Sequence, residues 1–386
     1  MTENVLEFGP CRRARFLARP NRFVVHCRLP DGEEARAFLP NPGRLWELLL
    51  PEAVVHLRDG GRRSSQNAGR KYRYTAVAVE REGAPVLLHT HWTNQVARIL
   101  LEQKRIPGLE DVSILRAEVA HGRSRFDFLL RRRRTDLFLE VKSCTLFGNR
   151  VAMFPDAVTD RGRRHLLELA ELSRRRVRPV VLFLVHTSDV DWFLPDYHTD
   201  LAFSQTLLQV RKKLDVIAVS LRWRSDLTLA PEVRRLHIPW SMLKREARDR
   251  GSYLLLLRLD REHRLRVGRL GQLSFPAGFY LYVGSAMQNL SARLARHQRK
   301  RKKFHWHIDH LREAAAACIP LAIRSSTRDE CSLAAALSEI CAAGPRGFGA
   351  SDCACPTHLF FSEQNPLQLR PFHDLLQRFR MKPPEP

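Results

Sequence analysis

Two apolar segments, residues 125–130 and 137–142, constrain the possible fold of this chain more than any other feature. Each has the composition of a short β-strand, and a basic turn, residues 131–136, joins them into a predicted hairpin. Asp127 lies on the first strand, and Glu140 and Lys142 lie two residues apart on the second. Because side chains alternate between the two faces of a strand, Glu140 and Lys142 share one face. The pattern predicts that two carboxylates and one ammonium group converge at this hairpin.

This set of side chains suits metal-assisted cleavage of a phosphodiester bond. Carboxylate oxygens are the ligands that Mg²⁺ or Mn²⁺ prefers, so Asp127 and Glu140 are the candidate metal ligands. Lys142 is the candidate catalytic lysine, because an ammonium group can position or activate a water molecule and offset developing charge. The alternative is an ordinary hairpin with solvated charges, since the pattern is short.

The charge balance indicates a polyanionic partner. The chain has 65 Lys and Arg against 41 Asp and Glu, a formal net charge of +24. Such an excess favours nucleic acid over a membrane surface. Codon bias can explain the preference for Arg over Lys, but it does not explain the excess of base over acid. The sequence leaves the oligomeric state open.

Other features of the composition predict a cytoplasmic protein. The first ten residues are polar and acidic, unlike a signal peptide, and no apolar run is long enough to span a membrane. The eight cysteines show no disulfide framework. A length of 386 residues predicts two or three domains.

The pattern along the chain predicts three folded parts. Short strands separated by turn signals over residues 14–89 indicate a small barrel of the oligonucleotide-binding (OB) kind. Predicted helices then alternate with buried strands up to residue 221, which is typical of an α/β core. A polar, basic segment follows as a linker. The expected domains are residues 1–90, residues 91–235 and residues 251–386, with the linker at residues 236–250.

Several passages, in order, resemble the sugar fermentation stimulation protein (SfsA) family. They are residues 14–19, 21–23, 41–45, 124–128, 140–143, 154–159, 161–162 and 165–166. The resemblance covers about residues 10–240 and implies an OB-like domain followed by a PD-(D/E)xK nuclease-like α/β domain that binds DNA. It gives Asp127 and Glu140 as the metal site, Lys142 as the catalytic lysine, and Arg22 and Arg44 as nucleic-acid contacts.

The same resemblance suggests further residues around that site. Glu102, on the preceding predicted helix, is a weaker candidate for another acid, and Asp156, Arg161 and His165 are candidates to line the pocket. Helix capping and surface charge are their alternative roles. Pro42 is a departure, because the family more often has Thr there and Pro lacks a hydroxyl group.

A second set of motifs resembles the GIY-YIG nuclease domain, in a small branch of uncharacterised function. Residues 251–257 and 278–286 are two predicted strands that each carry Gly and Tyr, and a predicted helix follows at residues 289–297. Further marks of that branch occur at residues 305–311 and 348–353, so the resemblance covers about residues 250–362. It implies the following roles: Tyr253 and Tyr282 as motif tyrosines, Arg293 and His297 as catalytic residues, and Glu330 as the ligand of one Mg²⁺.

The residue types fit that chemistry. A tyrosine can orient a water molecule, and an arginine can stabilise charge on the phosphate. Ser252 replaces the usual Ile of the first motif, and the spacing between the two tyrosines is longer than is typical. The alternative is that the tyrosines pack and the domain only binds.

A basic run lies directly after the second set of motifs. Phe304 and Trp306 follow it, and basic side chains beside aromatic rings suit phosphate contacts with base stacking. The alternative is a solvated run of charge. The candidate nucleic-acid contacts in this run are Arg299, Lys300, Arg301, Lys302 and Lys303.

Late cysteines and histidines raise the question of a metal. Cys353, Cys355 and His358, with Cys331 and Cys341 upstream, are soft ligand types, but C-x-C-x-x-H is not a standard zinc spacing. A reduced thiol cluster is the favoured interpretation, and metal binding stays open. The histidines at residues 305–310 fit a packed helix better than a metal site.

Together these patterns predict an α/β multidomain chain with an OB-like β-barrel, a PD-(D/E)xK nuclease-like domain and a GIY-YIG-like domain. The expected function is Mg²⁺- or Mn²⁺-dependent hydrolysis of DNA at one or both nuclease-like sites. A non-catalytic DNA-binding regulator of sugar metabolism is the alternative, and RNA as the substrate stays open.

Overall fold

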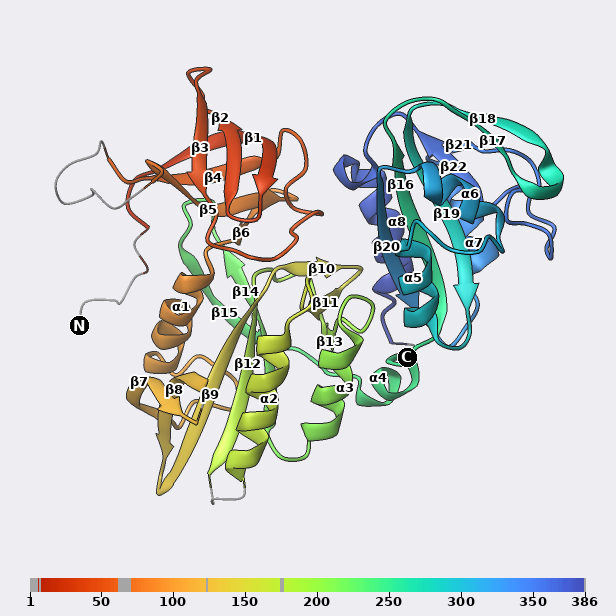
Figure 1. Cartoon of the computed structure of the whole chain (residues 1–386). Helices are drawn as coiled ribbons and strands as arrows, with labels where there is room; N and C mark the ends of the chain where they lie inside the picture. Colours follow the sequence, from red (N-terminus) through yellow and green to blue (C-terminus); the bar gives the residue numbers. More distant parts are fainter. Residues whose placement is uncertain (1–5, 7, 62–70, 123, 174–176, 385–386) are drawn as a thin grey trace. The chain divides into compact units, whose positions relative to one another are not determined.

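The computed structural model describes residues 6, 8–61, 71–122, 124–173 and 177–384. The chain divides into two compact units (Figure 1). The first unit comprises residues 1–196, 202–240 and 383–386, and the second comprises residues 197–201 and 241–382. Each unit is described by itself below.

The first unit begins with a small barrel. Its strands are β1 (Cys11–Asn21), β2 (Val24–Arg28), β3 (Glu34–Phe38), β4 (Val54–Asp59), β5 (Tyr74–Arg81) and β6 (Ala84–Leu87). They form a sheet in the order β3-β2-β1-β4-β5-β6, and a parallel pairing of β3 with β5 closes the first five strands into a barrel. Alternate residues of β3 are buried and exposed, as expected when one face of a strand lines a core. The predicted OB-like barrel is confirmed.

A mixed sheet of six strands follows the barrel in the first unit. Its order is β15-β14-β12-β9-β8-β7, with β12 parallel to both β9 and β14. The predicted hairpin, which carries Asp127 and Glu140, is the antiparallel pair β8 and β9. The strands are β7 (Ser113–His121), β8 (Ser124–Arg132), β9 (Thr135–Cys144), β12 (Arg178–Val185), β14 (Asp215–Trp223) and β15 (Leu229–Arg235).

Helices cover both faces of this sheet. On one face, α1 (Thr90–Glu102) packs against β9 and β7, and its Leu100 belongs to the same buried cluster as Leu182 of β12. On the other face, α2 (Asp160–Leu172) and α3 (Leu201–Val210) pack against the neighbouring residues of the same strand, such as Phe183. The near-continuous apolar run of β12 is explained by this burial on both faces. A small sheet of β10 (Leu146–Gly148), β11 (Val151–Phe154) and β13 (Trp192–Pro195) completes the unit.

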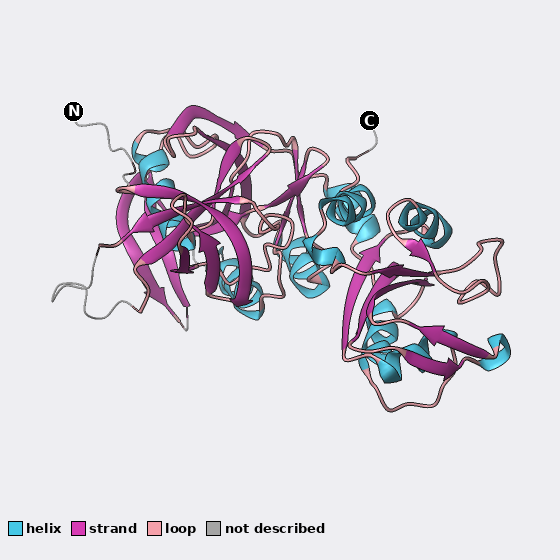
Figure 2. Cartoon of the chain, turned by 90° about the horizontal axis from the view of Figure 1, so that it is seen from above, coloured by secondary structure: helices cyan, strands magenta, loops and turns pink. Residues whose placement is uncertain are grey.

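The second unit is an antiparallel sheet with helices packed against it (Figure 2). The sheet order is β20-β16-β19-β22-β21, and β17 and β18 form a separate hairpin. The elements are β16 (Gly251–Leu259), β17 (His263–Arg266), β18 (Gln272–Phe275), β19 (Gly278–Ala286), α5 (Leu290–Gln298), α6 (His307–Ala314), β20 (Ala317–Arg324), α7 (Glu330–Ser338), β21 (Ala342–Ala343), β22 (Leu359–Ser362) and α8 (Arg370–Arg380), with single 3-10 turns at Gly268–Leu270 and Pro366–Gln368.

One detail differs from the sequence-based expectations. The segment expected to be a linker contains a short helix, α4 (Trp240–Glu246). Among the described residues, no helix has the length and apolar character needed to cross a membrane.

Candidate functional site

The hairpin of β8 and β9 opens at the position of Asp127. The two strands pair from Arg132 and Thr135 up to Phe128 and Leu139, and the pairing ends there. Oδ2 of Asp127 then accepts a hydrogen bond of 2.7 Å from the backbone N–H of Val141. The carboxylate therefore takes the place of a main-chain partner, which holds it rigidly beside β9.

Glu140 is the most constrained carboxylate of the site. Its Oε1 lies 2.5 Å from Nζ of Lys142 and 2.5 Å from Nδ1 of His165, which comes from α2. Its Oε2 is buried and has no hydrogen-bond partner within the described part of the chain. The side chain is only 5% exposed, so a free carboxylate oxygen is held away from bulk water. Such an oxygen is suited to bind a cation.

The electrostatics of the two acids differ. Burial, followed by the nearby charge of Glu140, raises the pKa of Asp127 to about 6. Burial alone would also raise the pKa of Glu140, but Lys142 and His165 outweigh it and lower that pKa. Two carboxylates that repel each other in a buried place are stabilised when a divalent cation sits between them. The donor set therefore fits Mg²⁺ or Mn²⁺, which prefer oxygen ligands.

Two helices supply further polar groups that fix these acids. Nδ2 of Asn94, on α1, donates to Oδ1 of Asp127 at 2.7 Å. His165 receives a 3.4 Å hydrogen bond from Nε of Arg161 on its second ring nitrogen, so its Nδ1 is the nitrogen that donates to Glu140. Sequence reasoning named His165 and Arg161 as pocket residues but missed Asn94, because only the packing of α1 brings that amide to the hairpin.

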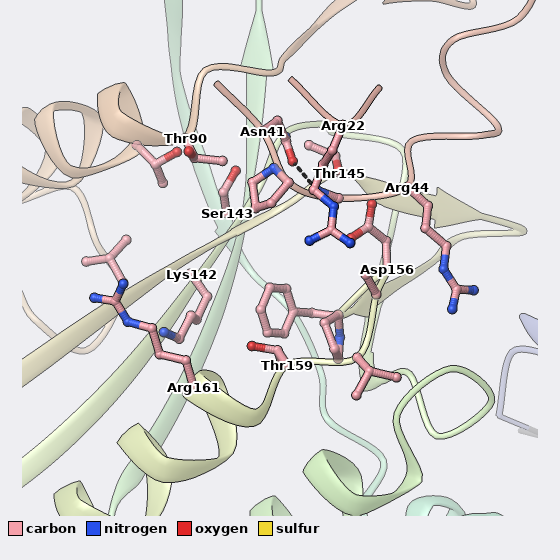
Figure 3. Close-up of a pocket in the computed structure, with 18 of the residues that line it drawn as sticks. Arg22, Asn41, Arg44, Thr90, Lys142, Ser143, Thr145, Asp156, Thr159 and Arg161 are labelled. Atoms are coloured by element: carbon pink, nitrogen blue, oxygen red, sulfur yellow. Dashed lines mark hydrogen bonds between the residues drawn. The ribbon is translucent and has the colours of Figure 1, made fainter. Parts of the chain in front are cut away.

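Asn94, Asp127, Glu140 and Arg161 border a pocket of about 860 Å³ within the first unit, whereas His165 lies behind Glu140 and is not among the lining residues. Figure 3 shows that its basic side chains come from separate elements: Arg22 from the barrel, Lys142 from β9 and Arg161 from α2. Arg44 also lines it and lies 4.9 Å from the centre of the Trp46 ring, another lining residue. Carboxylates at the base and cations at the wall are the arrangement expected for a metal-bound phosphate ligand. Glu102 is not among the lining residues, and it lies 3.9 Å from Arg98 on the same helix.

The barrel wall of the pocket is the loop at residues 41–44. Arg19 donates to the carbonyl oxygens of Gly43 and Arg22, at 2.8 and 2.7 Å. Asp156, from the segment after β11, is buried against this loop and accepts from the backbone N–H of Leu45 at 3.2 Å. A Cβ added at Gly43 would lie 2.3 Å from Oδ2 of Asp156. Gly43 therefore leaves room for the Asp156 carboxylate, which attaches the loop to the α/β part of the unit through its hydrogen bond with Leu45.

Glu47, which follows that loop, is buried, and its surroundings predict a pH-dependent contribution to stability. Burial, followed by the charge of Asp156, raises its pKa to about 7. A raised carboxyl pKa means that the folded state holds its proton longer, so the stability from this group falls as pH rises from about 5 to 8. We expect Glu47→Gln to be more stable than the wild type at pH 8, by roughly 2–3 kcal/mol.

Urea unfolding at pH 5 and pH 8 checks this expectation. Glu34→Gln is the control, because it removes the same formal charge from an exposed residue of β3. An equal stability difference between wild type and Glu47→Gln at both pH values would contradict the assignment.

In the second unit, the structure brings the two motif tyrosines together. The Tyr253 and Tyr282 rings lie 6.5 Å apart, and the hydroxyl of Tyr253 lies 2.9 Å from Nε2 of His297. Tyr253 faces Gly284 across β16 and β19, and a Cβ at Gly284 would lie 2.4 Å from its ring. All three side chains are buried, which raises the pKa of both tyrosines and lowers that of His297 to about 3.

The other predicted residues of the second unit lie around this cluster. Arg293 lies 4.1 Å from the centre of the Trp306 ring, and its charge opposes the effect of burial on the pKa of Tyr253. Oε2 of Glu330, at the start of α7, accepts from the hydroxyl of Ser285. The burial of the tyrosines suits a packed core better than a site open to a polymer.

The residues of the basic run after α5, residues 299–303, differ in their exposure. Lys302 turns inward, where its Nζ lies 2.9 Å from Oδ1 of the buried Asp309 and its side chain is 6% exposed. Its role here is structural, which differs from the expected phosphate contact. The side chains that stay exposed are Arg299, Lys300, Arg301 and Lys303.

Three family models match successive parts of the chain. "SfsA N-terminal OB domain" matches residues 17–88, and "Sugar fermentation stimulation protein RE domain" matches residues 91–226. "Domain of unknown function DUF123", a GIY-YIG-like family, matches residues 252–381. The matched ranges agree with the two resemblances found in the sequence.

Individual proteins match more limited parts of the chain. The sugar fermentation stimulation protein homolog of Methanosphaera stadtmanae is 39% identical over 194 residues, 50% of this chain and 79% of that protein. The homolog of Clostridium tetani is 34% identical, over 58% of this chain and 96% of that protein. A solved structure of Pyrococcus furiosus SfsA in complex with Ca²⁺ has a TM-score of 0.55 at 27% identity, covering 60% of this chain and 97% of that one.

Proposed function

The chain belongs to the sugar fermentation stimulation protein family, and on that premise we propose that it binds DNA and hydrolyses phosphodiester bonds with Mg²⁺ or Mn²⁺. The observation that carries the proposal is Oε2 of Glu140, which is buried, lacks a hydrogen-bond partner among the described residues, and lies beside Asp127 at a pocket lined by basic side chains. A solvated hairpin would leave these carboxylates in water, whereas here Glu140 is buried, Asp127 is half-buried, and side chains of two helices hold them.

Each residue has a distinct role in the proposed reaction. A bound divalent cation would polarise the phosphate and lower the pKa of a water molecule, with Asp127 and Glu140 as its protein ligands. Lys142, held by Glu140, places its ammonium group where it can orient the water or offset charge on the phosphate. His165 and Arg161 act as positioning residues, because they fix the orientation of the Glu140 carboxylate.

The related SfsA structure supports the metal site. That protein from Pyrococcus furiosus was solved in complex with Ca²⁺, a hard cation that takes carboxylate oxygens as Mg²⁺ does. By this analogy, a divalent cation is the expected occupant of the Asp127 and Glu140 site.

We assign the hydrolysis to the hairpin site rather than to the tyrosine cluster. Asp127, Glu140 and Lys142 line a pocket of about 860 Å³, and the Lys142 side chain is 14% exposed, whereas Tyr253 is 2% exposed and His297 is fully buried. In this proposal the second unit contributes to DNA binding through its exposed basic residues. A DNA-binding regulator that keeps both nuclease folds as scaffolds is the rival function.

Nicking of supercoiled plasmid tests the proposal. We expect nicked and then linear DNA with Mg²⁺ or Mn²⁺, and intact plasmid when EDTA is added. Fluorescence anisotropy with labelled single-stranded, duplex and branched DNA measures binding in parallel, and matched RNA substrates test the nucleic acid class. Tight binding without metal-dependent cleavage of any of these substrates would favour the regulator.

A further inference from the structure

A second candidate metal centre lies in the second unit, away from the residues proposed for hydrolysis. The ligand atoms of Cys331, Cys353, Cys355 and His358 all lie within 4.8 Å of one another. Cys331 comes from the first turn of α7, and the other three come from the segment that leads into β22. The fold therefore brings three thiols and one imidazole together, although Cys331 lies 22 residues before Cys353 in the sequence.

The spacing of the ligand atoms suits a tetrahedral zinc ion. With Zn–S near 2.3 Å and Zn–N near 2.0–2.1 Å, a sulfur and a nitrogen ligand should lie about 3.6 Å apart and two sulfurs about 3.8 Å apart. Sγ of Cys353 lies 3.4 Å from Nε2 of His358, which is close to that value. Three sulfurs and one nitrogen form the Cys₃His set of structural zinc sites, whereas Mg²⁺ and Ca²⁺ prefer oxygen.

The second nitrogen of His358 strengthens the case. His358 is 1% exposed, and its Nδ1 lies 3.2 Å from Oε1 of Glu330. The other oxygen of Glu330 is held by the Ser285 hydroxyl. The contact of Nδ1 with Glu330 has the distance but not the geometry of a hydrogen bond among the described residues. Metal-bound histidines usually have a carboxylate next to the free ring nitrogen, as here. Glu330 is therefore placed to orient a ligand, whereas the GIY-YIG resemblance implied that it binds Mg²⁺ itself.

We propose that Cys331, Cys353, Cys355 and His358 bind one Zn²⁺ in a closed structural site. The metal would join the start of α7 to the segment before β22. That segment also packs against the tyrosine cluster, because His358 donates its backbone N–H to Phe348 and accepts one from Val283, next to Tyr282. Zinc binding is therefore expected to stabilise the side of the second unit that carries Tyr282.

Two other states of these four residues are alternatives to a bound zinc ion. The thiols could stay reduced without a metal, or two of them could join in a disulfide and leave the third free. In the described part of the chain every cysteine is a free thiol, Cys318 and Cys341 included. Cys341 lies just after α7 but is not part of the cluster, so it provides a matched control.

Elemental analysis of the purified full-length chain tests the proposal. We expect about one zinc per chain in the wild type and in Cys341→Ser, and at least a fivefold loss in Cys353→Ser/Cys355→Ser. Cys331→Ala is a second variant, chosen because Cys331 is exposed and its replacement disturbs packing least. Its zinc content is expected to fall as well.

Cobalt substitution separates ligation from misfolding. Co²⁺ added to the reduced, metal-free wild type should give the visible bands of tetrahedral coordination and the near-ultraviolet thiolate bands, and Cys341→Ser should retain both. A wild type that holds no zinc and gives no such bands, or zinc retained at the wild-type level by both cluster variants, would overturn the proposal. These readouts do not depend on DNA cleavage, so the proposed hydrolysis can fail while the zinc site stands.

Discussion

Replacing Glu140 with Gln should lower Mg²⁺-dependent plasmid nicking by about 10²- to 10³-fold, the scale of removing one preorganised group from an active site. Gln keeps the size of Glu and can still accept hydrogen bonds from Lys142 and His165 on its carbonyl oxygen. Its amide nitrogen replaces the unpartnered Oε2 and cannot bind a cation. The loss should therefore appear in metal binding and cleavage rather than in DNA affinity.

The comparison variant is Asp136→Asn, which removes the same charge from the other end of β9. Asp136 pairs with the exposed Arg131 at the hairpin turn, outside the pocket. It should cleave at the wild-type rate. Mn²⁺ binding followed by isothermal titration calorimetry should be weakened in Glu140→Gln and unchanged in Asp136→Asn. Nicking that survives in Glu140→Gln but disappears in Arg293→Ala would move the reaction to the second unit.

The core of the hairpin site was predictable from local sequence. Alternation along one strand places Glu140 and Lys142 on one face whatever the rest of the chain does, because the period of a strand is two. The position of Asp127 beside them required only the short turn between the strands. These relations extend over fewer than twenty residues, which is why a pattern alone could capture them.

The groups that orient these side chains were not predictable in the same way. Asn94 reaches Asp127 only because α1 packs on one face of the sheet, and His165 reaches Glu140 only because α2 packs on the other. The cysteine cluster shows the same limit. The spacing of Cys353, Cys355 and His358 gives three ligands, and the fourth, Cys331, arrives through the packing of α7.

Removing the basic wall of the pocket should weaken DNA binding and reduce its dependence on salt. The triple variant Arg22→Ala/Arg44→Ala/Arg161→Ala deletes three cations that border the cavity. Each phosphate contact contributes about 0.9 to the slope of log affinity against log salt concentration, so the slope should fall by about 2.7. At 0.15 M salt the affinity should drop by roughly 10- to 100-fold. Anisotropy titrations at several salt concentrations measure both quantities.

A control of equal charge decides whether position or net charge causes this effect. Arg125→Ala/Arg131→Ala/Arg178→Ala also removes three positive charges, from exposed residues that pair with Glu118, Asp136 and Asp215 outside the pocket. Long-range attraction alone would weaken DNA binding equally in both triple variants, because the net charge of the chain changes by the same amount. A direct contact at the pocket predicts a large change in slope only for the Arg22, Arg44 and Arg161 set. Equal slopes in the two variants would place the DNA-binding surface elsewhere on this basic chain and separate it from the carboxylate site.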